Sequence, residues 1–184
     1  MITFIILAVV LVILILMYNS LVSKKNQVTN IFSNVDVQLK KRFDLIPNLV
    51  SSVQVYMKHE KSILEELTKL RTDSNRSNLS DNDKIALDRK VAKALGSIMV
   101  AVENYPDLKA NVNVLDLQHS LNEVEAQISA ARRAYNQAIT NYNNALEMFP
   151  TNLMAKAMNY KIKDVFEIDE TQRENINIKS LFEK

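Results

Sequence analysis

The N-terminal apolar run constrains the fold of this chain more than any other feature. Residues 2–18 read ITFIILAVVLVILILMY, which contains no charged residue and only Thr3 as a polar one, and Leu21 and Val22 extend it. A run of this length nearly spans the hydrocarbon core of a bilayer and is typical of a transmembrane helix. We therefore expect residues 1–22 to form a membrane anchor. Its anchor residues are Ile2, Phe4, Leu7, Val10, Leu14, Leu16 and Tyr18.

A cleaved secretory signal is the alternative interpretation of this run. Such a signal carries cations before its apolar region and a small-residue cleavage site after it. Here no cation precedes the run and YNSLVSKK follows it, which favours an uncleaved anchor. The nearest basic residues, Lys24 and Lys25, lie on the C-terminal side of the run. The positive-inside tendency therefore places residues 23–184 in the cytoplasm and the N-terminus outside.

The composition of the chain predicts an all-α fold. There is one glycine, Gly96, and there are three prolines, so the residues that build β-turns and glycine-rich phosphate loops are nearly absent. Cysteine is absent, which excludes disulfides and thiolate metal sites. A net charge of +2 from 23 cations and 21 acids gives no overall field of the kind that nucleic-acid-binding proteins use.

The first long helix after the anchor is predicted over residues 22–71, because apolar residues recur there at spacings of three and four. Pro47 lies inside this helix and removes one backbone hydrogen bond, so we expect a kink at that point. A functional hinge is the alternative. Asp44 and Asn48 are placed to satisfy the backbone groups that the proline frees.

Four charged residues lie beside the predicted apolar stripes. Arg42 and Glu60 fall at the margin of the stripe of the first helix, and each needs an opposite charge on a neighbouring helix if it is buried. Glu125 and Arg132 flank the stripe of a later helix one heptad apart. We expect these two residues to be the partners of Arg42 and Glu60.

The polar stretch over residues 72–83 interrupts the periodicity and predicts a loop. Ser80 and Asp83 have the spacing of a capping box, which places the start of a second helix near residue 81 and its end near residue 104. Gly96 lies inside this helix, where we expect the backbone of another element to approach closely.

The third long helix has the most regular pattern in the chain. Two sets of residues repeat every seven positions, which predicts a heptad seam for helix packing. The first set is Val114, Leu121, Ile128, Tyr135, Tyr142 and Phe149; the second is Leu117, Val124, Ala131, Ala138 and Ala145. The alanines imply close approach of a neighbouring helix. A short fourth helix is expected after Pro150.

Three strings of this sequence together carry a family resemblance: VDVQLKKRFDLIPNLV, ENYPDLKAN, and LQHSLNEVEAQISAARRAYNQAITNYNNALEMFPTNLMA. With the N-terminal run they resemble the LemA family of bacterial membrane proteins over residues 1–168. The resemblance implies one N-terminal span, a cytoplasmic antiparallel helical bundle and no established catalytic activity. Magnetosome-membrane relatives suggest a role in membrane organisation, by analogy of fold. Asn159 and Tyr160 depart from the glycine and aromatic residue that the family tends to show, although Asn can adopt a left-handed helix cap.

The predicted architecture is therefore all-α, in a single-pass protein of the bacterial cytoplasmic membrane. Residues 1–22 form an N-terminal transmembrane helix. Residues 23–168 form an antiparallel up-and-down helical bundle of three long helices and a short fourth. Residues 169–184 form a loosely ordered tail.

Chemistry-bearing motifs are weak in this sequence. HEKSILEE, residues 59–66, lacks the second histidine of the zinc-binding H-E-x-x-H pattern, and two histidines on separate helices offer no catalytic triad. The basic runs KKR and ARR lack interleaved aromatic residues, so nucleic-acid binding is not predicted. We predict no catalytic residue, cofactor, metal or small-molecule substrate.

Two functions from different classes remain. The first is a non-catalytic scaffold or adaptor, held by the lipid bilayer, that contacts a membrane protein or further copies of itself. The second is an enzyme or enzyme subunit with a polar site near Pro47 that uses Arg42, Asp44, Asn48 and Glu60. A continuous helix would place Arg42 and Glu60 about 27 Å apart, which argues against the second function. A concave pocket near residues 42–60 would favour it.

Overall fold

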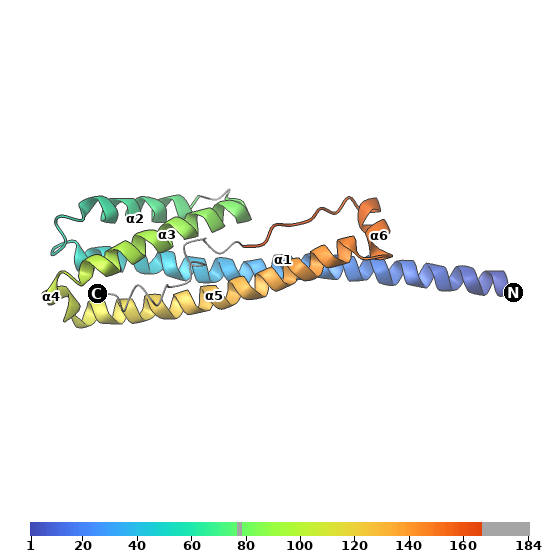
Figure 1. Ribbon diagram of the computed structural model, residues 1–184, viewed down its shortest axis with the longest axis horizontal. Coiled ribbons are helices and arrows are strands. Elements are labelled where there is room, and N and C mark those ends of the chain that lie inside the picture. Colours follow the sequence, from blue (N-terminus) through green and yellow to red (C-terminus); the bar gives the residue numbers. More distant parts are fainter. Residues whose placement is uncertain (77–78, 167–184) are drawn as a thin grey trace, which may run out of the picture.

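The computed structural model describes residues 1–76 and 79–166, and the described part of the chain is all-α (Figure 1). This confirms the predicted fold class. The helices in chain order are α1 Ile2–Val53, α2 Lys61–Ser74, α3 Asp81–Val102, α4 Pro106–Lys109, α5 Val112–Glu147 and α6 Thr151–Ala157. The predicted tail over residues 169–184 lies outside the described residues.

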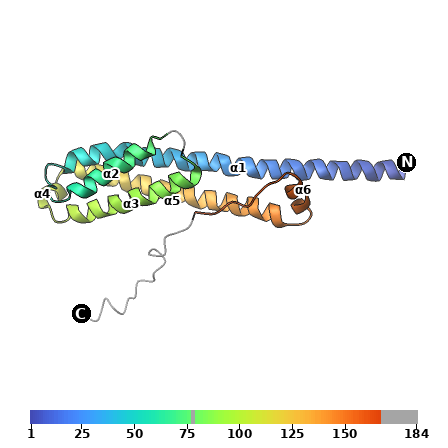
Figure 2. The ribbon, with the colours of Figure 1, turned by 90° about the horizontal axis from the view of Figure 1, so that it is seen from above.

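Helix α1 joins the apolar run to the bundle as one helix of 52 residues. Its N-terminal part extends alone beyond the other helices, while its C-terminal part packs in the bundle (Figures 1 and 2). The helix continues through Pro47, which is solvent-exposed. The backbone carbonyl that the proline leaves without an amide partner can therefore face water.

The predicted extension of this helix to residue 71 is wrong, because α1 ends at Val53. Turns follow, in which the amides of Tyr56 and Met57 both donate to the carbonyl of Val53. α2 then runs back alongside α1 and packs on α3 (Figure 1). The buried residues of α2, namely Leu64, Leu67 and Leu70, join the core through this reversal. A helix continuing past Val53 would have carried them beyond the end of the bundle, where apolar burial could not stabilise them.

Helix α5 packs antiparallel along the C-terminal part of α1 and forms the main interface of the bundle (Figure 1). Most of the predicted heptad seam faces the core, with Leu117 and Ala131 only partly buried. Phe149 is an exception, since α5 ends at Glu147 and the phenylalanine is exposed. The α2–α3 hairpin covers the half of the bundle that lies far from the N-terminus (Figure 2).

Helix α3 begins with the predicted capping box. The Ser80 hydroxyl accepts from the amide of Asp83, and the Asp83 carboxylate accepts from the amide of Ser80. The hydrogen bond from the Ser80 hydroxyl lowers the pKa of the Asp83 carboxyl. The expectation for Gly96 is wrong: the residue is exposed, and a Cβ atom added there would meet no atom within 4 Å.

The short helix predicted after Pro150 is α6, which lies beside α1. Asn159 then adopts a positive φ of 52°, as expected for a left-handed cap. The chain returns along α5 as an extended segment, residues 160–166 (Figure 1). Two asparagines of α5 hold it, because Asn143 and Asn136 each exchange two hydrogen bonds with its backbone.

Candidate functional site

A group of four charged residues, two of them fully buried, connects three helices at the centre of the bundle. Arg42 of α1 is 1% exposed and Asp88 of α3 is 0% exposed. The Arg42 Nη1 donates to Asp88 Oδ1 at 2.5 Å, and the Arg42 Nη2 pairs with the Glu125 carboxylate of α5. The Arg132 Nη2, also of α5, donates to Asp88 Oδ2. We call Arg42, Asp88, Glu125 and Arg132 the charge cluster.

The charge cluster balances its own charge, with two guanidinium groups and two carboxylates. Burial lowers the pKa of the Arg42 guanidinium, and the adjacent Asp88 carboxylate opposes this shift. A buried arginine needs such compensation, because an unpaired charge in a protein interior is strongly destabilising. The geometry is that of an internal ion network that joins α1, α3 and α5.

The other predicted site residues lie apart from the charge cluster. Glu60 accepts a hydrogen bond from the Tyr105 hydroxyl at 2.7 Å, so its predicted pairing with Arg132 is wrong. This bond raises the pKa of Tyr105, because it stabilises the protonated phenol.

The polar residues around Pro47 do not converge on a common site. Asp44, Pro47 and Asn48 lie on an exposed face of α1. The Asp44 carboxylate pairs with Lys40 at 3.2 Å, one helical turn away. The expectation that Asp44 satisfies the backbone groups near Pro47 is therefore wrong, because its carboxylate binds the Lys40 side chain.

Sequence reasoning missed Asp88, the carboxylate at the centre of the charge cluster. The spacing of Asp88 indicates that it faces the core, because Asp88 lies three and seven residues before the buried Val91 and Leu95 of the same stripe. An acidic residue at that spacing faces the core, where it needs a cationic partner.

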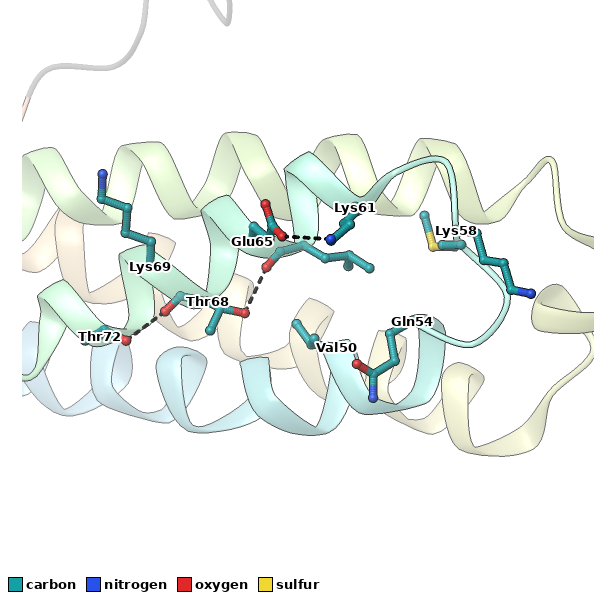
Figure 3. A pocket seen from close by; sticks show the side chains of 10 residues that line it. Val50, Gln54, Lys58, Lys61, Glu65, Thr68, Lys69 and Thr72 are labelled. Carbon is teal, nitrogen blue, oxygen red and sulfur yellow. Dashed lines mark hydrogen bonds and ion pairs between the residues drawn. The ribbon is translucent and has the colours of Figure 1, made fainter.

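A groove of about 750 Å³ lies between the C-terminal end of α1 and helix α2 (Figure 3). Its apolar lining residues are Val50, which is partly exposed, and Met57 and Leu64, which are buried at its floor, and Lys58, Lys61 and Lys69 contribute cations. The residues of the charge cluster, Asp44, Asn48 and Glu60 are not among its lining residues.

The polar side chains of the groove are mostly engaged within α2. Lys61 pairs with Glu65 at 3.6 Å. The hydroxyls of Thr68 and Thr72 donate to backbone carbonyls one turn earlier, at 2.8 and 3.0 Å (Figure 3). Within residues 1–76 and 79–166, no group of three or more His, Cys, Asp or Glu side chains is arranged to hold a metal ion. The groove offers a small apolar floor with basic edges, which suits contact with another macromolecule.

Within the same described ranges, α1 is the one helix that is long and apolar enough to cross a membrane. All seven predicted anchor residues are exposed in the isolated chain. Apolar side chains that are exposed on all sides of a helical segment, as in residues 2–18, match the pattern of a segment surrounded by lipid.

Comparison with known proteins places this architecture in a family. Protein LemA of Metamycoplasma hominis is 24% identical over 163 residues, which cover 89% of this chain and 74% of the relative. Magnetosome protein MamQ 2 of Paramagnetospirillum magneticum is 24% identical over 179 residues, with 84% of this chain and 66% of the relative covered. Magnetosome protein MamQ of Magnetospirillum gryphiswaldense is 23% identical, and this chain spans 65% of its length. The sequence pattern of the LemA family matches residues 31–180, and the chain belongs to the LemA family.

Proposed function

We propose that this protein is a non-catalytic, membrane-anchored scaffold that holds a helical bundle at the cytoplasmic face of a bacterial membrane. The observation that carries the proposal is the continuity of α1, whose first part is an exposed apolar run and whose second part lies in the bundle core. A helix of 52 residues is about 78 Å long at 1.5 Å per residue. The bundle is therefore joined to its anchor by a helix and not by a flexible linker.

The orientation of the bundle follows from the cations at the end of the run. Lys24 and Lys25 come directly after the apolar residues, on the side of the bundle. The positive-inside tendency supports a cytoplasmic bundle, and the same lysines favour contact with anionic headgroups.

The groove between α1 and α2 is the surface that we assign to a partner. Val50 lines the groove and lies about 44 Å along α1 from Leu21, which follows the apolar run. A partner bound there would contact the scaffold well away from the bilayer surface. Its chemistry is an apolar segment with acidic flanks, to match Lys58, Lys61 and Lys69. Such a segment belongs to the cytoplasmic part of a membrane protein or to a second copy of this chain.

Photo-crosslinking in intact cells tests this proposal. A photoreactive amino acid at Lys58 probes the groove, and one at Lys41, which is exposed but does not line the groove, is the matched control. We expect the Lys58 probe to capture one or two specific membrane proteins, or the chain itself, in the membrane fraction. Equal, unspecific labelling from both positions would refute the assignment of the groove. Recovery of the chain in the soluble fraction after alkaline extraction would refute the anchor.

A further inference from the structure

Three large apolar side chains are exposed where the chain turns from α5 into α6. Met148 is 64% exposed, Phe149 is 80% exposed, and Leu153 in the first turn of α6 is 60% exposed. We call residues 148–153 the α5–α6 corner. Apolar side chains that gather on a surface mark a contact with a partner or a membrane.

The register of α1 and α5 gives the level of this corner along α1. Arg42 pairs with Glu125, and the rings of Phe32 and Tyr135 are 5.3 Å apart, so a step of ten residues on α1 matches a step of ten on α5. Counting fourteen residues back from Phe32 on α1 and fourteen forward from Tyr135 on α5 places Tyr18 at the level of Phe149. Tyr18 is the last residue of the apolar run, where the bilayer interface is expected.

The packing of α6 supports the same position. Leu21 of α1 is fully buried in the core cluster that also contains Ala155 of α6. Helix α6 therefore lies beside the turn of α1 that ends the membrane span. Both views show α6 at this point, with the N-terminal part of α1 extending past it (Figures 1 and 2).

Cations lie close to the corner. Lys24 and Lys25 follow the span on α1, and Lys156 is exposed on α6. The Lys25 ammonium lies 4.7 Å from the centre of the Tyr160 ring, which ties this lysine to the segment after α6. Glu147 is the exposed acid next to the corner. Apolar side chains with adjacent lysines are the combination that binds the interface of a membrane with anionic lipids.

We propose that the α5–α6 corner inserts Phe149 and Leu153 into the interfacial layer of the bilayer that α1 spans, with Lys24, Lys25 and Lys156 among the lipid headgroups. This inference rests on the proposed membrane anchoring by α1. The bundle then has two contacts with the bilayer, one through the span and one through the corner. Two contacts fix the tilt of the bundle, whereas a single span can tilt in the bilayer and carry the bundle with it.

Depth-dependent quenching of tryptophan fluorescence tests the insertion. The chain contains no tryptophan, so a single introduced one reports its own position. Phe149→Trp places the probe at the corner. Val112→Trp is the matched control, because Val112 is also an exposed apolar residue and lies at the opposite end of α5. Leu11→Trp places the probe in the span. Each full-length variant is reconstituted into vesicles of phosphatidylcholine and phosphatidylglycerol, with and without brominated acyl chains.

We expect brominated lipid to quench Leu11→Trp and Phe149→Trp several-fold more than Val112→Trp, with a blue-shifted emission at position 149. Quenching at position 149 as weak as at position 112, with strong quenching at position 11, overturns the corner contact and leaves the anchor in place. Weak quenching at position 11 overturns both. Far-UV circular dichroism checks that each variant keeps the helix content of the parent chain, which we expect because all three substitutions are at exposed positions.

Discussion

Replacing Asp88 by alanine removes the carboxylate that Arg42 and Arg132 share. Arg42 stays buried and keeps Glu125 as a partner, but the Glu125 side chain is 52% exposed and partly hydrated. Removing one partner of a buried ion pair costs about 3–5 kcal/mol of unfolding free energy, because the other charge stays buried without compensation. Since Glu125 remains, we expect D88A to destabilise the bundle by about 3 kcal/mol, at the lower end of this range.

The double variant R42M/D88L separates the cost of the unpaired charge from the cost of lost packing. It replaces the buried pair by apolar side chains of similar size, a change that is often neutral or stabilising. Arg132 and Glu125 lose their partners but are 31% and 52% exposed, so water can solvate them. The double variant should therefore be more stable than D88A by about 2 kcal/mol.

Urea unfolding of the full chain in detergent micelles, followed by far-UV circular dichroism, measures these free energies. Because Glu125 is half exposed, E125Q is the control and should cost no more than about 1 kcal/mol. A double variant whose loss equals the sum of the losses in R42M and D88L would refute the reasoning. Such additivity would show that Arg42 and Asp88 act by packing alone.

Three further predictions concern single residues. Gly96→Ala should stabilise α3 by about 1 kcal/mol in the same urea assay, because the position is exposed, helical and free of contacts within 4 Å; a loss of stability would contradict the described surroundings. Ala138→Leu should destabilise the bundle by about 1–3 kcal/mol through overpacking against α1, and an unchanged midpoint would contradict that close approach. Glu60→Gln should lower the pKa of Tyr105, followed by NMR of ¹³C-labelled tyrosine, since the charged acceptor now raises that pKa. In the parent chain the bond stabilises the fold below the unfolded tyrosine pKa, about 10, and this contribution is lost as the pH rises through the raised pKa of the folded state; identical titration curves would refute the link.

The features that sequence predicted well are those that local chemistry determines. The capping box of α3 needs only Ser80 and Asp83. The heptad seam of α5 follows from spacing, and the apolar run from composition. The seam failed at Phe149, because a periodic pattern cannot show that the helix has already ended at Glu147.

The apolar pattern does not predict the end of α1 at Val53, because Val53 and Met57 are buried both by a helix that continues and by a helix that ends there. Val53 and Met57 are four residues apart, which fits a continuing helix, and both are buried although the helix ends between them. The reversal is determined by tertiary packing, since Leu64, Leu67 and Leu70 reach α3 only if the chain turns back. The groove depends on the separation of α1 and α2, which no residue pattern encodes.

Asp88 shows a second limit of prediction from sequence. A charged residue on an apolar stripe is explained only together with its partner, and the partner lies on another helix. The sequence predicts that Arg42 needs an acidic partner if it is buried, and it offers Glu125 because that residue flanks a regular seam. Asp88 lies on a helix whose orientation to α1 was unknown before the fold was seen. Asp88, the fully buried acidic partner of Arg42, could therefore be identified only from the arrangement of α1, α3 and α5.

The charge cluster also bears on where the α5–α6 corner lies. A heptad seam can slip by seven residues and still place apolar residues against apolar residues, so the seam of α5 does not determine its own register. A slip of this size would separate Arg42 from Glu125 and Arg132 from Asp88. Because Glu125 and Arg132 are seven residues apart, the slip would also bring Arg132 to the level of Arg42, or Glu125 to the level of Asp88, and so place like charges side by side. It would also move Phe149 by about 10 Å along α1, at 1.5 Å per residue, and so out of the level at which the apolar run ends. The buried ions at the centre of the bundle thus select the one register in which both the core and the proposed membrane contact are satisfied.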